Sequence, residues 1–119
     1  MAGKPVHIEI PAADAATASA FWGALFGWQF QAFEGAPSPY LMTRFTDESG
    51  GAIYEDASDR GMRVYFDVDD IDAGAGKVRE LGGEAGEKLP VPSMGWFAHC
   101  TDPSGNEFGL WQNDPSASM

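Results

Sequence analysis

Two short segments of this 119-residue chain place polar side chains at alternating positions, where they could do acid–base or binding chemistry. In the first segment, His7 and Glu9 alternate with apolar residues. This pattern predicts a strand whose alternate side chains share one face, so the imidazole and the carboxylate would lie side by side. An imidazole titrates near neutrality, and a carboxylate can act as a general base. His7 is therefore a candidate for ligand contact, with a purely structural hydrogen-bonding role as the equal alternative.

The second segment has the same alternation, with Arg63 and Tyr65 as the polar positions. A guanidinium can grip a carboxylate or phenolate through two parallel hydrogen bonds. Arg63 and Tyr65 are therefore candidates for binding an anionic group of a small ligand, or else ordinary structural residues. If the two segments pair about a pseudo-twofold axis, Glu9 is expected to form an ion pair with Arg63 rather than to act as a base.

Aromatic residues concentrate near the end of the chain, where they could stack on a planar ligand. About half of the residues in any strand face the core. The four aromatic residues there are Trp96, Phe97, Phe108 and Trp111. We therefore expect about two of them to face a ligand.

The elements that must position these residues can be predicted from the pattern. Strands are expected near 6–10 and 63–68, and each precedes a helix that an aspartate caps, Asp14 or Asp70. The first helix should end at Gly27 and be amphipathic, and the second should end at Gly82–Gly83. Three shorter strands are expected after each helix, near 28–33, 40–45 and 52–55, then near 84–89, 96–101 and 107–112.

The chain also repeats itself. Thr46–Gly50 recurs with one change as Thr101–Gly105, and Asp14 and Asp70 lie 56 positions apart. This indicates an internal duplication, with each half reading strand, helix and three strands. We expect a single domain, 1–119, with module 1 at about 5–57, module 2 at about 62–113, a short polar link at 56–61 and a flexible tail at 114–119.

Composition excludes several classes of protein. A net charge of −11 argues against nucleic acid and anionic membranes as partners. One cysteine, Cys100, permits no intramolecular disulfide and fits a reducing compartment. The first residues lack an apolar signal segment, and no stretch approaches the ~20 apolar residues that span a bilayer. A cytoplasmic protein is expected.

Taken together, these motifs resemble the vicinal oxygen chelate (VOC) superfamily, which includes glyoxalase I, extradiol dioxygenases and bleomycin-resistance proteins. The motifs that carry the resemblance are 7–11 (HIEIP), Phe21–Trp22, 26–28 (FGW), Gly82–Gly83, 102–106 (DPSGN) and 108–111 (FGLW). The resemblance implies an α+β fold in which two tandem βαβββ modules form a curved mixed sheet with a cleft, the glyoxalase/bleomycin-resistance/dioxygenase fold.

The resemblance also implies four metal-ligand positions in the cleft, one in the first and one in the last strand of each module. They fall on His7, Arg63, Gly109 and Tyr54, or on Ile53 in place of Tyr54 if the register slips by one residue. Only His7 can coordinate a metal as the family does, because a guanidinium is not a ligand and glycine has no side chain. The sequence therefore predicts no inherited metal site, with His7 as a weak candidate ligand. A different site made from His7, Glu9 and Glu107 is left open.

The predicted function is small-molecule binding of the glyoxalase/bleomycin-resistance type, without a cofactor, by a homodimer. The alternative is a divalent-metal-dependent lyase, isomerase or dioxygenase that uses His7 with Glu9 or Glu107, so catalysis is left open. A third hypothesis, that the cleft is a surface for a protein partner, has no support in the sequence. The residues expected to line the cleft are His7, Glu9, Tyr54, Arg63, Tyr65, Trp96, Glu107 and Trp111.

Overall fold

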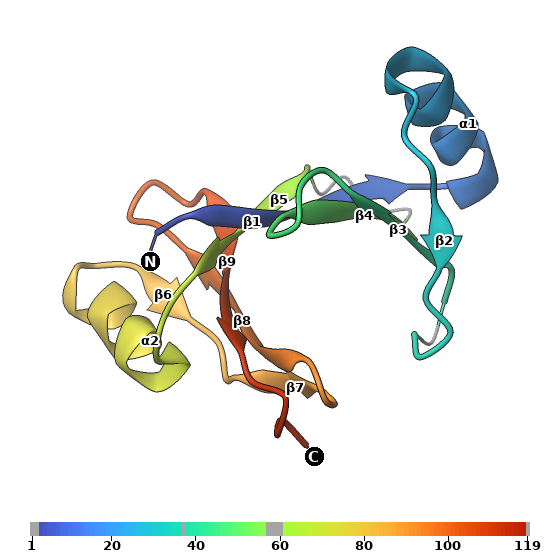
Figure 1. Ribbon diagram of the computed structural model, residues 1–119. Helices are drawn as coiled ribbons and strands as arrows, with labels where there is room; N and C mark the ends of the chain where they lie inside the picture. The colour runs from blue at the N-terminus through green and yellow to red at the C-terminus, as the bar shows by residue number, and fades with distance from the viewer. Residues whose placement is uncertain (1–2, 37, 57–60, 119) are drawn as a thin grey trace. The chain divides into compact units, whose positions relative to one another are not determined.

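The computed structural model describes residues 3–36, 38–56 and 61–118, and it divides into two compact units (Figure 1). The N-terminal unit is His7–Arg63. The C-terminal unit combines Met1–Val6 with Val64–Met119. Each unit has its own group of paired strands, its own helix and its own core. The expected link at 56–61 falls largely on residues outside the described part of the chain.

The N-terminal unit has a four-stranded mixed sheet with the order β2-β3-β4-β1. Its strands are β1 (Pro5–Ala12), β2 (Gln31–Ala32), β3 (Tyr40–Arg44) and β4 (Gly50–Glu55). Strand β1 runs parallel to β4, and the other pairs are antiparallel. Helix α1 (Ala15–Phe26) packs on one face, where Ile10, Ala15 and Ile53 are buried. The opposite face carries the polar residues of β1.

Helix α1 begins and ends as its sequence predicts. Asp14 accepts hydrogen bonds from the backbone nitrogens of Ala16 and Thr17 at 3.0 and 3.3 Å, and the helix ends at Gly27, which has a φ of 75°. Glycine suits this position because the left-handed region is strained for other residues.

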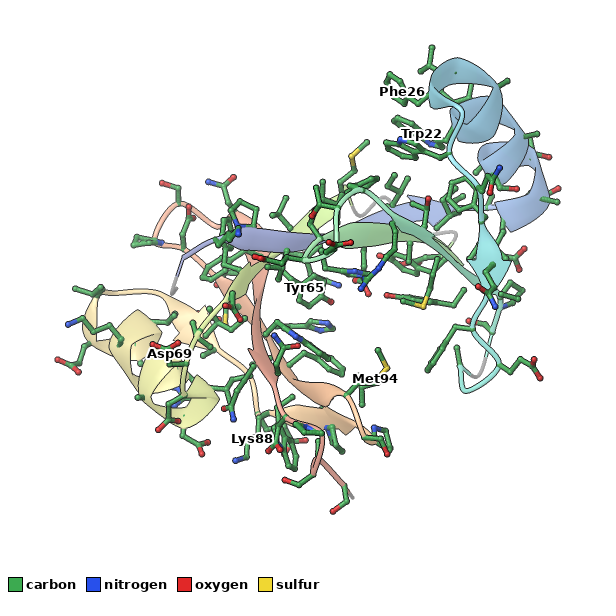
Figure 2. All side chains as sticks on the ribbon, in the orientation of Figure 1. Trp22, Phe26, Tyr65, Asp69, Lys88 and Met94 are labelled. Carbon is green, nitrogen blue, oxygen red and sulfur yellow. The ribbon has the colours of Figure 1, made fainter. Side chains whose placement is uncertain are left out.

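The expected amphipathic pattern of α1 is only partly correct. Trp22 packs against the core, and its indole stacks on that of Trp28 with centroids 5.5 Å apart. Phe21, Leu25 and Phe26 are instead 60%, 55% and 56% exposed. The helix is apolar around most of its circumference, so one sheet cannot cover all of its large side chains. Trp22 and Phe26 are labelled in Figure 2.

The C-terminal unit repeats this architecture with one additional strand. Its main sheet has the order β5-β9-β8-β6, and β7 also pairs with β8. The strands are β5 (Arg63–Asp67), β6 (Glu84–Ala85), β7 (Leu89–Val91), β8 (Gly95–Thr101) and β9 (Glu107–Asn113). Strand β5 is parallel to β9, and the other pairs are antiparallel. Helix α2 (Ile71–Glu80), capped by Asp70, packs on β6, β8 and β9 (Figure 1).

The repeated βαβββ order confirms the expected α+β fold of two modules, with two differences in the strands. The strand expected at 84–89 is divided into β6 and β7, and Gly86 between them donates its N–H to the carbonyl of His99. The strand expected at 28–33 contracts to β2, because Trp28 and Phe30 turn into the core of the N-terminal unit.

Asp114 and Ala117, within the segment expected to be a flexible tail at 114–119, are bonded to the β7–β8 turn. The Asp114 N–H donates to the carbonyl of Met94 at 2.9 Å, and the Ser93 N–H donates to that of Ala117 at 3.0 Å. Ala117 is buried. A segment held by such contacts is part of the folded unit. Within the described residues, no helix has the length and apolar character needed to cross a membrane.

Candidate functional site

Four side chains of the N-terminal unit form a hydrogen-bonded group on the face opposite α1. We call His7, Glu9, Tyr40 and Arg63 the polar cluster. The Tyr40 hydroxyl donates to Glu9 Oε2 at 3.0 Å, and Arg63 Nη1 donates to Glu9 Oε1 at 3.2 Å. Glu9 therefore has both carboxylate oxygens engaged, and the ion pair with Arg63 expected from the sequence is present.

The hydrogen bonds also assign the proton on His7. His7 Nε2 lies 2.9 Å from the Tyr40 oxygen. Since the phenol has one proton and gives it to Glu9, Nε2 must carry the hydrogen and donate it to Tyr40. Burial lowers the pKa of His7, and the charge of Glu9 offsets part of this effect. The imidazole is therefore neutral at pH 7 and acts as a donor.

Arg63 of the polar cluster is buried, the other three residues are half-buried, and aromatic rings border the cluster. The side chain of Arg63 is only 4% exposed and that of Glu9 is 14% exposed. The rings of Phe33 and Tyr54 have centroids 6.2 and 6.4 Å from that of Tyr40. Tyr54 is directly opposite Tyr40 in the β3–β4 register, so both rings project from the face that carries Glu9. The arrangement can offer directional hydrogen bonds within an apolar surround, as ligand sites commonly do.

In the C-terminal unit, the Tyr65 ring covers Gly109. The two residues are opposite each other in the β5–β9 register, and a Cβ added at Gly109 would overlap the ring of Tyr65. The Tyr65 hydroxyl lies 3.0 Å from His99 Nε2 on the next strand. Tyr65 thus occupies the space into which the family's glutamate would project.

A second ring covers a second glycine on the same face. A Cβ added at Gly95 would lie 2.6 Å from Cζ2 of Trp111, and the indole Nε1 donates to Asn113 Oδ1 at 2.9 Å. Phe97 lies opposite Trp111 in the β8–β9 register. We call the set of rings on this face the aromatic platform, which consists of Tyr65 (labelled in Figure 2), Phe97, His99 and Trp111.

The structure separates the aromatic residues that the sequence grouped together. Phe97 and Trp111 lie on the aromatic platform, while Phe108 packs against the core on the α2 side. Trp96 also packs on that core, and its Nε1 donates to Asp114 Oδ2 at 3.0 Å. Two of the four thus share the face of the aromatic platform and Trp96 does not, while which of them meets a ligand stays a prediction. Glu107 is on the face of Gly109, as parity predicted.

Sequence reasoning missed Tyr40 and His99. Both had a local signal: Tyr40 alternates with Leu41 and Thr43 in β3, and His99 alternates with Ala98 and Cys100 in β8. Their role depends on cross-strand neighbours, which the alternation alone does not identify. Together they form the hydroxyl–imidazole contacts of the two units, Tyr40 with His7 and His99 with Tyr65.

The family's metal does not fit the side chains at the four corresponding positions. Arg63 presents a cation bound to Glu9, and the Tyr65 ring fills the space beside Gly109. Tyr54 and His7 remain as donors, which is too few for a divalent ion. Among the described residues, no three His, Cys, Asp or Glu side chains converge as a metal site would require.

Comparison with known proteins identifies the class of domain. Residues 7–111 match the family model of the glyoxalase-like domain, and the chain belongs to that family. This match confirms the resemblance to glyoxalase-like proteins, and the fold of the chain matches that of methylmalonyl-CoA epimerases. The Streptomyces coelicolor enzyme with 2-nitronate-propionyl-CoA superposes with a TM-score of 0.73 at 18% identity over 100% of both chains. The Mycobacterium tuberculosis enzyme gives 0.71 at 14% identity, covering 94% of this chain and 89% of that one.

Two sequence relatives support the same class. CFP32 of Mycobacterium bovis, named as a candidate glyoxylase, is 31% identical over 121 residues, which are 92% of this chain and 46% of the relative. A glyoxylase-like domain-containing protein of Didymella fabae is 33% identical over 90 residues, 69% of this chain and 70% of the relative. The chain therefore spans about half the length of the mycobacterial relative.

Proposed function

We infer that this glyoxalase-like domain binds a small organic molecule and does so without the metal ion of its family. The observation that carries this inference is the packing of Tyr65 over Gly109, which replaces a ligand position by a ring. The ion pair of Arg63 with Glu9 also argues against a metal ion, because the Glu9 carboxylate is already bound to a cationic side chain. Hydrogen bonding and stacking then supply the binding energy.

The polar cluster would orient the ligand. His7 is held as a neutral donor by burial, and Tyr40 links it to Glu9 and Arg63. Such a preorganised group costs little ordering entropy when a ligand arrives. Within the N-terminal unit we assign ligand contact to His7, Glu9, Tyr54 and Arg63, and within the C-terminal unit, taken by itself, to Tyr65, Glu107 and Trp111. The ligand-bound structural relatives, such as the epimerase with 2-nitronate-propionyl-CoA, support an organic ligand.

A metal titration tests the metal-free part of this proposal. Protein purified without chelator should contain far less than one equivalent of metal by plasma mass spectrometry. Mg²⁺, Mn²⁺, Ni²⁺ and Zn²⁺ should leave its thermal midpoint unchanged, since a ligand that binds only the folded state would raise it. Stoichiometric metal that is lost in His7→Ala would contradict the proposal. That result would support the alternative, a metal-dependent lyase, isomerase or dioxygenase using His7 with Glu9 or Glu107.

A ligand screen tests the binding part. A panel of metabolites and aromatic compounds is examined by thermal shift, and each hit is titrated against Tyr40→Phe and His7→Gln. Both variants remove a hydrogen bond of the polar cluster, so a hit should weaken by about fivefold or more. Arg44→Met is the control, because Arg44 is exposed and outside the cluster. Hits that bind equally to all variants would place binding elsewhere.

We also propose that the protein is a cytoplasmic homodimer. The exposed Phe21, Leu25 and Phe26 of α1 give a physical reason for association, because burying them would release apolar surface from water. The buried Cys100, whose pKa is raised by burial, suits a reducing compartment. Light scattering should give twice the 12.7 kDa of one chain. If light scattering at a protein concentration of about 100 μM gave the mass of one chain, the dimer would be contradicted.

A further inference from the structure

An open groove lies on the α2 side of the C-terminal unit, and its lining residues all belong to that unit. Its volume of about 470 Å³ falls in the range of small-molecule sites, roughly 300–1,000 Å³. Polar groups come from the β8–β9 turn and the start of β9, namely Asp102, Asn106 and Glu107. The walls are apolar side chains in or just after β5 and in β9, namely Val64, Phe66, Val68, Phe108 and Leu110.

The groove and the aromatic platform lie on opposite faces of the same strands. Tyr65 belongs to the platform, so its neighbours Val64 and Phe66 in β5 face the other way. Phe108 of the groove packs against the core on the α2 side. A molecule in the groove would therefore be bound apart from Tyr65 and the rest of the platform.

The N-terminal unit has a wall that corresponds to the wall of this groove. Ile10 pairs with Ile53 in the β1–β4 register as Phe66 pairs with Leu110 in the β5–β9 register, so Ile10 and Phe66 correspond. Ile10 is only 8% exposed, whereas Phe66 is half-buried and lines the groove. The difference lies in what covers each wall.

Phe45 covers part of the wall in the N-terminal unit. It directly follows β3, and its Cζ would lie 3.1 Å from a Cβ added at Gly51. By the same register, Gly51 corresponds to Phe108 of the groove. The residue that directly follows β8 is Asp102. The C-terminal unit thus has a short polar side chain where the N-terminal unit has a covering ring.

Trp22 supplies a second covering ring in the N-terminal unit, where its indole packs against the core. It lies eight residues after Asp14, which caps α1, and the residue eight positions after the α2 cap Asp70 is Val78. An isopropyl group covers much less of a sheet than an indole does. The groove is therefore the space that aromatic rings of the chain occupy in the N-terminal unit.

We propose that this groove binds a small uncharged aromatic molecule, which covers the wall as the chain's own rings do in the N-terminal unit. Binding removes the apolar wall and the ring of the ligand from water. Phe66 and Phe108 meet edge to face with centroids 6.1 Å apart, so they offer a ligand ring both an edge and a face.

The polar end of the groove disfavours an anion. Hydrogen bonds from Asn106 and Ser104 hold the pKa of Asp102 below its ordinary value, so its carboxylate is charged at pH 7 and repels negative ligands. This inference goes beyond the proposed function, because it places a second site on the α2 side of the C-terminal unit.

A titration with indole followed by nuclear magnetic resonance tests the site. Indole should bind with a Kd of about 1 mM or tighter and shift the amide signals of β5 and β9. Indole-3-carboxylate is the anionic probe of similar shape, and cyclohexanol is the uncharged probe without an aromatic ring. Each should bind at least about fivefold more weakly. Equal binding of either probe would overturn the ligand class, and no binding of indole would overturn the site.

Variants locate the binding. Val64→Phe fills the groove with a ring of the protein, and Phe66→Leu removes a ring from its wall. Either should weaken indole by about threefold or more, so one remains informative if the other does not fold. Leu89→Phe is the matched control, because it adds a ring at a 42% exposed position of β7 outside the groove and should leave the affinity unchanged. Unchanged affinity in both groove variants would overturn the proposal.

Other results would identify a different occupant or a different site. If Val64→Phe dissociates a homodimer and leaves indole binding unchanged, a second copy of the chain covers the groove and the proposal is overturned. If indole binding is lost in Tyr40→Phe and kept in Val64→Phe, indole binds at the polar cluster, which supports the proposed function and overturns the second site. If indole depends on Val64 while no molecule depends on His7 or Tyr40, the groove stands and the proposed function is wrong.

Discussion

The ion pair of Arg63 with Glu9 yields the strongest test of the structure. Arg63→Met keeps much of the side-chain volume but leaves the Glu9 carboxylate without its cation. Removing one partner of a buried pair costs roughly 3–5 kcal/mol. Glu9 is 14% exposed and keeps the Tyr40 hydroxyl at 3.0 Å, so the lower end applies, about 3 kcal/mol. For a chain of this size, that loss lowers the thermal midpoint by about 10 °C or more.

The assay is urea unfolding followed by circular dichroism at pH 7, for the wild type, Arg63→Met, Glu9→Gln and the double variant. The double variant leaves no unpaired buried charge, so it should be more stable than the sum of the single losses predicts, by about 1.5 kcal/mol or more. Arg44→Met is the control: Arg44 is exposed and donates only to the carbonyl of Asp47, so its loss should change stability by less than about 0.5 kcal/mol. A cost below about 1 kcal/mol for Arg63→Met, or strict additivity, would refute the reasoning.

Two further predictions concern single positions. Gly109→Ala should destabilise by about 1–3 kcal/mol, because its Cβ would overlap the Tyr65 ring. Gly76→Ala in α2 is the control, because an added Cβ there meets nothing within 4 Å, and it should stabilise the protein by about 0.5–1 kcal/mol. Equal urea midpoints for the two variants would be evidence against the packing of Tyr65 on Gly109. Burial lowers the pKa of His7 below its ordinary value of 6.5 in the folded state, so as the pH falls through that value the unfolded chain binds more protons and stability falls. The urea midpoint should therefore fall less with decreasing pH in His7→Gln than in the wild type. Identical pH profiles for the two proteins would contradict this prediction.

The elements were predictable because their signals are local. Alternation places β1 and β5, and the side chains of Asp14 and Asp70 cap the two helices in the expected positions. The exposed face of α1 was not predictable, because Phe21 and Trp22 have equal apolar character. Which of them turns toward the sheet depends on the angle at which the helix packs.

The sequence predicted which site residues lie side by side only where they belong to the same strand. His7 and Glu9 share a face by parity, but Tyr40 lies 33 residues from His7 and joins it only through the sheet register. In β8, adjacent Trp96 and Phe97 must point to opposite faces, and nothing within that pair decides which is buried. The small Ala98 and Cys100 share the parity of Trp96 and pack in the core, so they were the usable signal.

Strand β1 is divided between the two units, so cleaving the chain between the units separates residues that belong to one of them. The Gly3 N–H donates to the carbonyl of Asp67 at 2.7 Å, and the Asp67 N–H donates to that of Lys4 at 2.8 Å, so the C-terminal unit includes backbone from the start of the chain. Cleavage between Arg63 and Val64 would therefore not release two self-sufficient halves. The first fragment would retain a segment that the second needs, and fragment 64–119 should gain structure when a short peptide of the first residues is added in trans.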